Sequence, residues 1–324
     1  MFSKLLSFFS KTQPRSQRYE ANFNIAEDFL INGPLPISSL CDLVKSFGTG
    51  MQGKCTKVLR GHTDDVTALA VLSDQKLASG SNDQTVRIWE KSDCVLILKG
   101  HTKGVTSLAV LPNGNLASGS LDATVCFWDT TQGRCLSVMN VHRSPVYAVA
   151  ALPDGRLLSG GMDTFRCISN IDIKHVSVCC GVGKGTFAIA VSSQGNVATS
   201  LGHTIKVWGQ RPCVLSGHFD SVKALTMLSD GKIASASLNK IILACKHGIQ
   251  IQLCRGQFGL VHSLSVVNGM LVSGTQDATV SIWDDDGSRL LAMTGHSRDV
   301  MALAVLADGT LASGSRDRTI RLWN

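Results

Sequence analysis

The stretch LASGSRDRTIRLWN, residues 311–324, holds the pattern on which the fold depends. Its two apolar runs, LASGS and TIRLW, lie on either side of the turn-forming residues RDR. Apolar residues that alternate with small or polar ones predict two β-strands joined by a tight turn. Close copies occur at three earlier places: LASGSNDQTVRIWE (77–90), LASGSLDATVCFWD (116–129) and LVSGTQDATVSIWD (271–284).

Gly-His pairs set the spacing of these copies. Successive markers lie 39, 41, 76, 39 and 39 residues apart, and the interval of 76 equals two repeats of 38. A fixed period of this kind is the signature of a repeat architecture, and here it predicts seven repeats. The markers are, in order, His62, His101, His142, His218, Gln257 in the place of a His, and His296.

Inside each repeat, short apolar runs alternate with turn-forming residues. The first repeat contains VTALAVL (66–72), KLASGS (76–81) and TVRIW (85–89), separated by SDQ and NDQ. A period near two predicts strands, and four antiparallel strands (a to d) in about 40 residues are typical of a propeller blade. We therefore predict an all-β, seven-bladed β-propeller over residues 52–324.

The two ends of this region predict how the ring closes. The chain stops at Asn324, directly after strand c of the last repeat, whereas residues 54–60 (KCTKVLR) form a strand d that has no blade of its own. Pairing of these N-terminal and C-terminal strands would complete the seventh blade and cover sheet edges that are otherwise exposed.

The recurrent residues resemble those of the WD40 family, and the resemblance covers residues 52–324. It implies one hydrogen-bond network per blade among the His, a Ser of strand b, the turn Asp and the Trp, since each of these half-buried groups needs a partner. Because the His residues lie one to a blade, we expect a structural role and no metal site. The three complete tetrads are His62, Ser79, Asp83 and Trp89; His101, Ser118, Asp122 and Trp128; and His296, Ser313, Asp317 and Trp323.

The other blades depart from this pattern, and we predict that blades 3 to 5 are less rigid than blades 7, 1 and 2. The replacements are Ser169 for Trp in blade 3, Val182 and Gly202 near the His and Asp places of blade 4, Asn239 and Cys245 for Asp and Trp in blade 5, and Gln257 for His in blade 6.

In the family that the chain resembles, partners usually bind the face that carries the d–a and b–c loops. Blades 7 and 1 place mostly charged and polar residues there, whereas blades 2 to 5 contribute seven apolar or aromatic ones. An exposed apolar patch usually marks a partner site, although these side chains could instead turn inward or be covered by the N-terminal segment. The candidate partner-binding residues are Leu121, Pro145, Tyr147, Met162, Phe187, Leu201 and Leu238.

No residue set marks an enzyme, metal or cofactor site. The eleven cysteines form no C-x-x-C pair and recur at strand positions, which favours small buried apolar residues in a reducing compartment. The segment CCGVGKGTF (179–187) lacks the spacing of a phosphate-binding loop and precedes a strand pattern rather than a helix. We therefore expect a protein without catalytic activity and without a cofactor.

Charge and hydropathy narrow the range of partners. The chain has 31 basic and 24 acidic residues, and four of the basic ones precede the first acidic residue, Glu20. The remainder holds no run of Lys and Arg of the kind that nucleic-acid binding needs. No stretch approaches 18 consecutive apolar residues, so we expect no transmembrane segment.

Residues 1–51 form a separate extension. Apolar positions within residues 2–9 would give a short helix an apolar face, which is typical of an organelle-targeting peptide or a membrane-surface anchor; the alternative is a disordered segment over residues 1–25. A second stripe predicts a helix at about 38–47. This part weakly resembles the start of an F-box, but an F-box needs about twice the available length.

Together these features predict a non-catalytic scaffold or adaptor that binds protein partners through one face of the propeller. The alternative is a substrate-recognition subunit of a ubiquitin ligase or another enzyme complex, recruited through residues 1–51. We expect a cytoplasmic location, or an organelle if the basic N-terminus acts as a targeting segment.

Overall fold

The computed structural model describes residues 53–170, 175–180, 185–209, 212–228, 231–238, 242–246, 249–252, 259–284 and 287–324. They belong to one unit, Gly53–Asn324. The predicted extension of residues 1–51, including the stripe at 2–9 and the helix at 38–47, lies outside them.

Every regular element in these ranges is a β-strand, and the predicted all-β propeller is confirmed. The strands form seven four-stranded antiparallel sheets, which we call blades. Blades 1 to 4 consist of β2 (Val66–Val71), β3 (Leu77–Ser81), β4 (Thr85–Glu90) and β5 (Asp93–Lys99); β6 (Val105–Val110), β7 (Leu116–Ser120), β8 (Val125–Asp129) and β9 (Arg134–Met139); β10 (Val146–Ala151), β11 (Leu157–Gly161), β12 (Phe165–Asn170) and β13 (His175–Cys180); and β14 (Ile189–Val191), β15 (Val197–Leu201), β16 (Thr204–Trp208) and β17 (Cys213–Leu215).

The other three blades follow the same order, except that the last one takes its outer strand from the start of the unit. They consist of β18 (Val222–Met227), β19 (Ile233–Ser237), β20 (Ile242–Lys246) and β21 (Ile249–Gln252); β22 (Val261–Val267), β23 (Met270–Thr275), β24 (Val280–Trp283) and β25 (Arg289–Met293); and β26 (Val300–Val305), β27 (Leu311–Ser315), β28 (Thr319–Trp323) and β1 (Cys55–Arg60).

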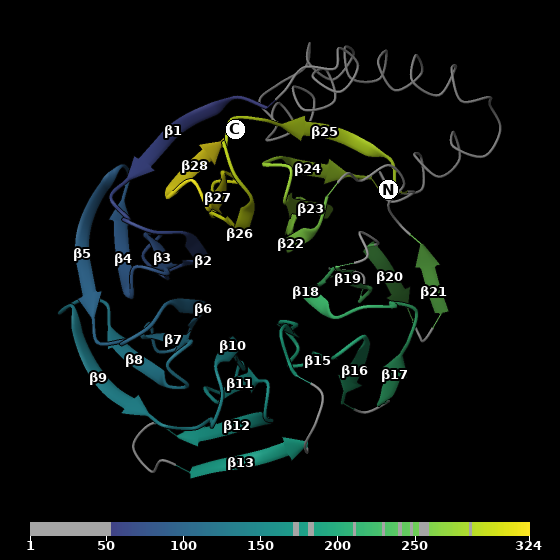
Figure 1. Cartoon of the computed structure of the whole chain (residues 1–324), viewed down its shortest axis with the longest axis horizontal. Helices are drawn as coiled ribbons and strands as arrows, with labels where there is room; N and C mark the ends of the chain where they lie inside the picture. The colour runs from purple at the N-terminus through teal and green to yellow at the C-terminus, as the bar shows by residue number, and fades with distance from the viewer. Residues whose placement is uncertain are drawn as a thin grey trace, which may run out of the picture. The chain divides into compact units, whose positions relative to one another are not determined.

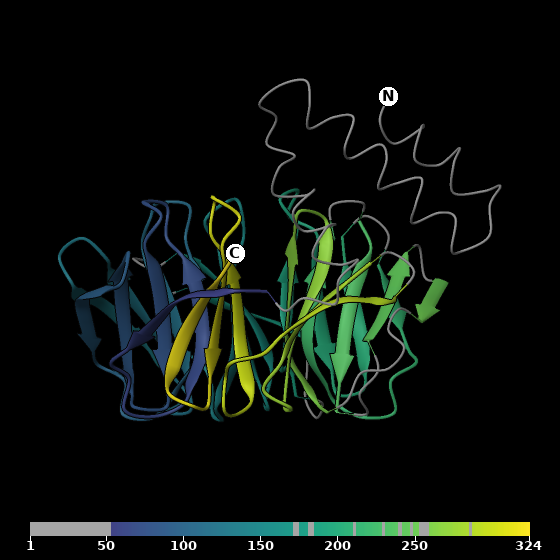
Figure 2. The same ribbon diagram turned by 90° about the horizontal axis from the view of Figure 1, so that it is seen from above.

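The blades follow one another around a ring (Figure 1). The first strand of each blade contacts the first strand of the next, and β26 contacts β2 to complete the circle. Figure 2 shows the ring from its side, with strands running between its two faces. The tetrad His lies in the loop before strand a, and the tetrad Asp lies in the turn after strand b. Because strands a and b are antiparallel, the start of one and the end of the other lie at the same end of the blade.

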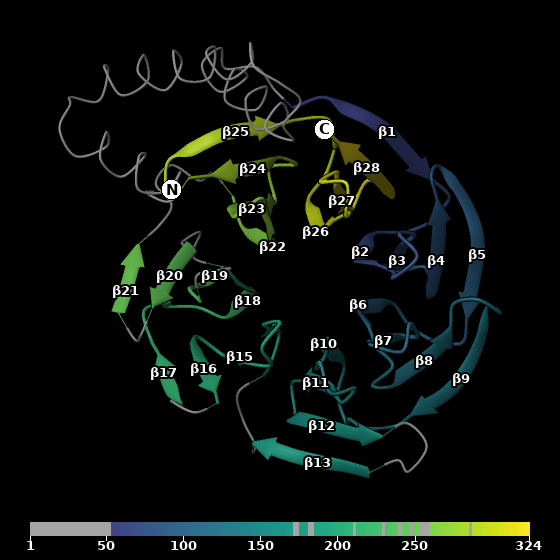
Figure 3. The same ribbon diagram turned by 180° about the vertical axis from the view of Figure 1, so that it is seen from behind.

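The predicted closure of the ring is confirmed. Strand β1 pairs antiparallel with β28, with Val58 opposite Arg321 and Leu59 opposite Ile320. Figure 3 shows β1 on the outside of this blade, along β28, with β5 of the neighbouring blade following it around the rim. Leu59 is buried in a cluster with residues of blades 7 and 1, so closure also completes a part of the core.

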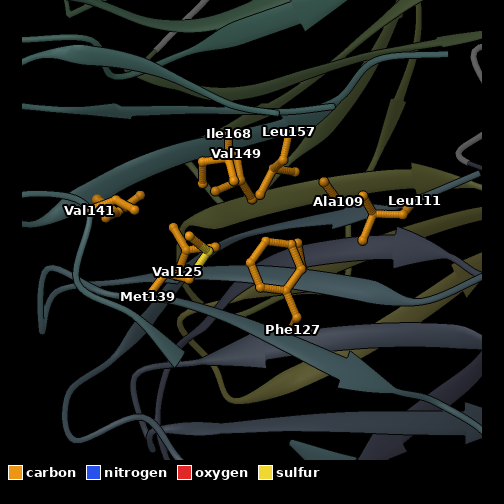
Figure 4. Packing of buried hydrophobic residues seen from close by; sticks show 11 residues of the cluster. Ala109, Leu111, Val125, Phe127, Met139, Val141, Val149, Leu157 and Ile168 are labelled. Atoms are coloured by element: carbon orange, nitrogen blue, oxygen red, sulfur yellow. The ribbon is translucent and has the colours of Figure 1, made fainter. Parts of the chain in front are cut away.

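The core lies between blades, and the strand-b sequence explains how closely they pack. All five residues of LASGS are buried in β3, β7 and β27. A methyl group on Gly119 would lie 2.7 Å from the Val146 side chain of the next blade, so this Gly leaves room for that Val. Between blades 2 and 3, Phe127 packs with Leu157 and Ile168 (Figure 4). Small residues in strand b therefore permit large ones in the neighbouring blade.

Candidate interaction face and the tetrads that shape it

Each complete tetrad is a chain of three hydrogen bonds that begins at the turn Asp and ends at the Trp. In blade 1, the two ring nitrogens of His62 lie 2.8 Å from Asp83 Oδ2 and 2.7 Å from Ser79 Oγ. The indole N–H of Trp89 donates to the same Ser79 oxygen at 2.7 Å. Since the His and Asp lie in different loops, these hydrogen bonds connect the d–a loop to the b–c turn.

The structure brings together the four predicted residues in blades 2 and 7 as well. The three distances are 3.0, 2.7 and 2.8 Å for His101, Ser118, Asp122 and Trp128. They are 2.7, 2.7 and 2.8 Å for His296, Ser313, Asp317 and Trp323. The near-identical geometry shows that the recurrent residues build a repeated structural unit.

The tetrad Asp residues are held in their ionised form. Burial opposes ionisation of Asp122, but hydrogen bonds from the Thr124 hydroxyl and the Thr102 backbone N–H outweigh it and lower its pKa to about 2. The pKa values of Asp83 and Asp317 are lowered in the same way, against burial, by their His and Thr partners. A carboxylate that accepts several hydrogen bonds is stabilised as an anion, and here it fixes a turn.

Sequence reasoning missed a fifth member of the network. A Thr two residues after the turn Asp donates its hydroxyl to the carboxylate at 2.6 Å in blades 1, 2 and 7. The signal was present in the sequence, because NDQT, LDAT and RDRT all place Thr at this position. The residues are Thr85, Thr124 and Thr319.

Blade 3 retains most of the network. His142 bonds Asp163 and Ser159 at 2.7 and 2.9 Å, and the Ser144 hydroxyl also donates to Asp163. The position predicted to replace the Trp, Ser169, lies in β12, and its side chain is outside the description.

Among the described residues, blades 4 and 5 show parts of the network. In blade 4 the Trp208 indole donates to Thr199 at 2.9 Å, and Gly202 occupies the turn. In blade 5, His218 bonds Ser235 at 2.8 Å. The other replacements predicted for blades 4 to 6, Val182, Asn239, Gln257 and the Cys245 side chain, lie outside the described residues.

Comparison with protein families agrees with this geometry. The family description "WD domain, G-beta repeat" matches residues 53–90, 92–129, 133–165 and 287–324. Four stretches of the chain are therefore WD40 repeats. No curated protein sequence matches it. WD40 propellers generally act as non-catalytic platforms that bind proteins. In the described parts of this WD40 protein, no three His, Cys, Asp or Glu residues are grouped so as to hold a metal ion, and no helix is long and apolar enough to cross a membrane.

On the loop face, the WD40 ring carries an aromatic cluster that spans blades 3 to 5. The Tyr147 and Phe187 rings are 5.0 Å apart, and the Tyr147 hydroxyl lies 3.8 Å from Met162 Sδ. The ammonium group of Lys223 lies 3.3 Å from the centre of the Phe187 ring, and burial lowers its pKa. We call Tyr147, Met162, Phe187 and Lys223 the aromatic cluster.

Contacts thus join three of the seven candidate partner-binding residues. Met162 is the most exposed, at 53%, and Tyr147 and Phe187 are partly exposed. The remaining four candidate residues also have partly exposed side chains: Leu121, Pro145, Leu201 and Leu238.

Two neighbouring residues were missed as candidates. Lys223 occupies the same repeat position as Tyr147 and Phe187, but its contact with an aromatic ring has no signal in the sequence. Phe219 is 91% exposed in the d–a loop of blade 5. The sequence could have indicated Phe219, because an aromatic residue stands there directly after the His, where other blades have polar residues: Thr63, Arg143 and Ser297.

The opposite side of the same face is charged, as the sequence indicated. Arg316 Nη1 lies 3.0 Å from Asp299 Oδ2, and Arg316 Nε lies 3.6 Å from Asp65 Oδ2. His262 Nε2 lies 3.2 Å from the same Asp299 oxygen. Burial, together with the charge of Asp64, raises the pKa of Asp65. The face is therefore apolar over blades 3 to 5 and charged over blades 6, 7 and 1.

Proposed function

We propose that this WD40 protein is a non-catalytic scaffold that binds a protein partner through the aromatic cluster. The observation that carries the proposal is the continuous contact from Met162 through Tyr147 and Phe187 to Lys223, which crosses three blades on the loop face. Aromatic residues and Met are enriched at the centres of protein interfaces, where Tyr often contributes much of the binding energy.

The adjacent residues support the same proposal. Phe219 exposes nearly its whole side chain in the loop of blade 5, and a large exposed phenyl ring is costly unless a partner covers it. The same face also has a charged sector beside the apolar one. It consists of Asp65, His262, Asp299 and Arg316. A partner that contacts both sectors can bind in only one orientation.

The test compares partners purified with the unmodified protein and with the variant Tyr147→Glu/Phe187→Glu/Leu238→Lys. A matched control, Val95→Glu/Ile97→Glu/Val214→Lys, makes the same kinds of change at exposed apolar positions of the outer strands. We expect the first variant to lose specific partners, measured by quantitative mass spectrometry, and the control to keep them. Circular dichroism checks that both variants fold. Retention of every partner by the first variant would refute the proposed face.

The adaptor alternative assigns recruitment of an enzyme complex to residues 1–51. Deletion of that segment separates the two hypotheses, because partner binding through the aromatic cluster survives the deletion, whereas recruitment through the extension is lost. A cytoplasmic location is part of the proposal. It is supported by the recurrence of unpaired cysteines at strand positions such as Cys55, Cys94 and Cys126, which suits a reducing compartment.

A further inference from the structure

A cavity of about 680 Å³ lies at the closure of the ring, between blades 7 and 1. Its volume falls in the range of about 300–1,000 Å³ that is typical of small-molecule sites. Strand β1, the a–b turn of blade 7 and the c–d turn of blade 1 surround it. The residues that matter for its chemistry are the apolar Leu59, Leu77, Trp89, Leu306 and Leu322 and the cationic Lys57 and Lys91.

Comparison with the cleft between blades 1 and 2 shows what is missing at the closure. In β1, Lys57 lies opposite Leu322, and its side chain is exposed. In β5, the equivalent residue is Leu96, which lies opposite Ile88 and packs against the core of blades 1 and 2. A Leu that fills one cleft is thus replaced by an exposed Lys in the other.

The a–b turn shows a second replacement. In blade 1, the Lys76 ammonium reaches 2.9 Å from Asp74 and 3.9 Å from Glu90, so its long side chain lies along the end of the sheet. The equivalent residue in blade 7 is Thr310, whose hydroxyl donates to Asn324 at 3.0 Å. The Thr310 side chain is shorter than that of Lys76, so it fills less of the space at the end of this blade.

The c–d turns differ in length as well. Trp89 pairs with Cys94, whereas the equivalent Trp128 pairs with Cys135, so the turn of blade 2 is two residues longer. This longer turn reaches the neighbouring blade, because a methyl group on Gly133 would lie 3.1 Å from the Leu96 side chain. The cavity therefore results from three local differences at the ring closure.

The charges at the cavity favour an anionic ligand. Lys57 and Lys91 are both exposed, and neither forms an ion pair with another residue in the described ranges. The carboxylate of Asp308 also lines the cavity, but it accepts a hydrogen bond from the Thr310 backbone N–H at 2.9 Å. An apolar floor with two available ammonium groups suits a molecule that has an apolar body and one anionic group.

We propose that the cavity between blades 7 and 1 is a binding site for a small organic anion with an apolar body. The body would lie against Leu77, Trp89 and Leu322, and the anionic group would lie near Lys57 and Lys91. This site is separate from the aromatic cluster, so the proposal is independent of the proposed function.

The test uses the fluorescent anion 1-anilinonaphthalene-8-sulfonate and the full chain. The variant Lys57→Leu/Thr310→Lys introduces the residues that fill the cleft between blades 1 and 2. The control Lys103→Leu/Thr102→Lys makes the same two changes at exposed loop positions. We expect the first variant to weaken binding by at least about tenfold and the control to leave it unchanged. Equal binding by all three proteins would overturn the proposal.

Two further measurements cover folding and charge. If the first variant fails to fold, Ala307→Phe replaces it in the test. Its larger side chain on the exposed a–b turn narrows the cavity, so we expect it to weaken binding of the anionic probe as well. N-phenyl-1-naphthylamine has the same rings as the anionic probe without its sulfonate. We expect the unmodified protein to bind the sulfonate more tightly than this neutral analogue, and Lys57→Gln/Lys91→Gln to remove that preference. Equal affinity for both probes in the unmodified protein would overturn the assignment of an anionic ligand.

Discussion

At the scale of single residues, Ser118 is the most connected member of its tetrad. Its hydroxyl oxygen lies 2.7 Å from His101 Nε2 and 2.8 Å from Trp128 Nε1, and the side chain is fully buried. Ser118→Ala leaves an imidazole and an indole without this shared partner, so we expect the free energy of unfolding to fall by about 3 kcal/mol. Urea unfolding measures the loss. The exposed Ser216→Ala should change stability little, and an equally small effect of Ser118→Ala would contradict the structural role.

The tetrad Asp residues predict a loss of stability in acid. The pKa of Asp122 is lowered from 3.8 to about 2 in the folded protein, so the unfolded chain binds the proton first as the pH falls. The contribution of Asp122 is therefore complete above about pH 4 and disappears as the pH falls through about 2. Urea unfolding at several pH values between 5 and 2 measures this dependence.

A matched pair of variants isolates the group responsible. We expect Asp122→Asn to make stability depend less on pH between 4 and 2, whereas the exposed Asp93→Asn should leave the dependence unchanged. An identical pH dependence in Asp122→Asn and in the unmodified protein would show that this carboxylate does not contribute.

At the scale of strands, the contact between strand b and the next blade predicts a coupled pair. Gly119→Ala places a methyl group 2.7 Å from Val146 Cγ1, and we expect it to cost about 2 kcal/mol of stability through overpacking. Val146→Ala in the same chain removes the clash, so the double variant should be more stable than the sum of the two single effects predicts. Strictly additive effects in thermal or urea unfolding would contradict a direct contact.

Blade 5 provides the reverse change at the equivalent position. Ala236 stands where blades 1 and 2 have Gly80 and Gly119, and it is buried beside Val261 of the next blade. Because this blade already accommodates the methyl group, Ala236→Gly should cost only about 1 kcal/mol. Because the neighbour is a Val in both blades, a larger loss of stability for Gly119→Ala than for Ala236→Gly in urea unfolding would show that the spacing between blades makes Gly necessary in blade 2.

The sequence was sufficient to predict the strands and the ring closure, because period-two patterns and repeated motifs depend on local residues. The contact between His62 and Asp83 was implied by the resemblance to the WD40 family, because recurring spacing alone does not show that two residues touch. Contacts without such a repeat could not be predicted. The position of Lys223 over Phe187 depends on how blades 4 and 5 pack, and the cavity beside Lys57 depends on turn lengths in two different blades.

At the scale of the whole molecule, the described residues place the three complete tetrads together on one side of the ring. Blades 7, 1 and 2 have complete tetrads that fasten the d–a loop to the b–c turn. Blade 4 has Gly202 at that turn, and its innermost and outermost strands have only three residues each, Ile189–Val191 and Cys213–Leu215. The aromatic cluster lies away from the complete tetrads, since Phe187 belongs to blade 4.

This asymmetry predicts different rates of local opening. We expect backbone amides of β15 and β16 to exchange with solvent deuterium faster than those of β7 and β8, because the described residues of blade 4 form no complete tetrad that would oppose opening. Hydrogen-exchange mass spectrometry on the full chain measures both regions at once. In Ser118→Ala, exchange in β7 and β8 should become faster while β15 and β16 stay unchanged. Equal protection of the two blades in the unmodified protein would show that packing between blades, rather than the tetrads, determines local stability.

A partner bound to Phe187 should slow exchange in blade 4 more than in blade 2, because we expect blade 4 to open more often in the free protein.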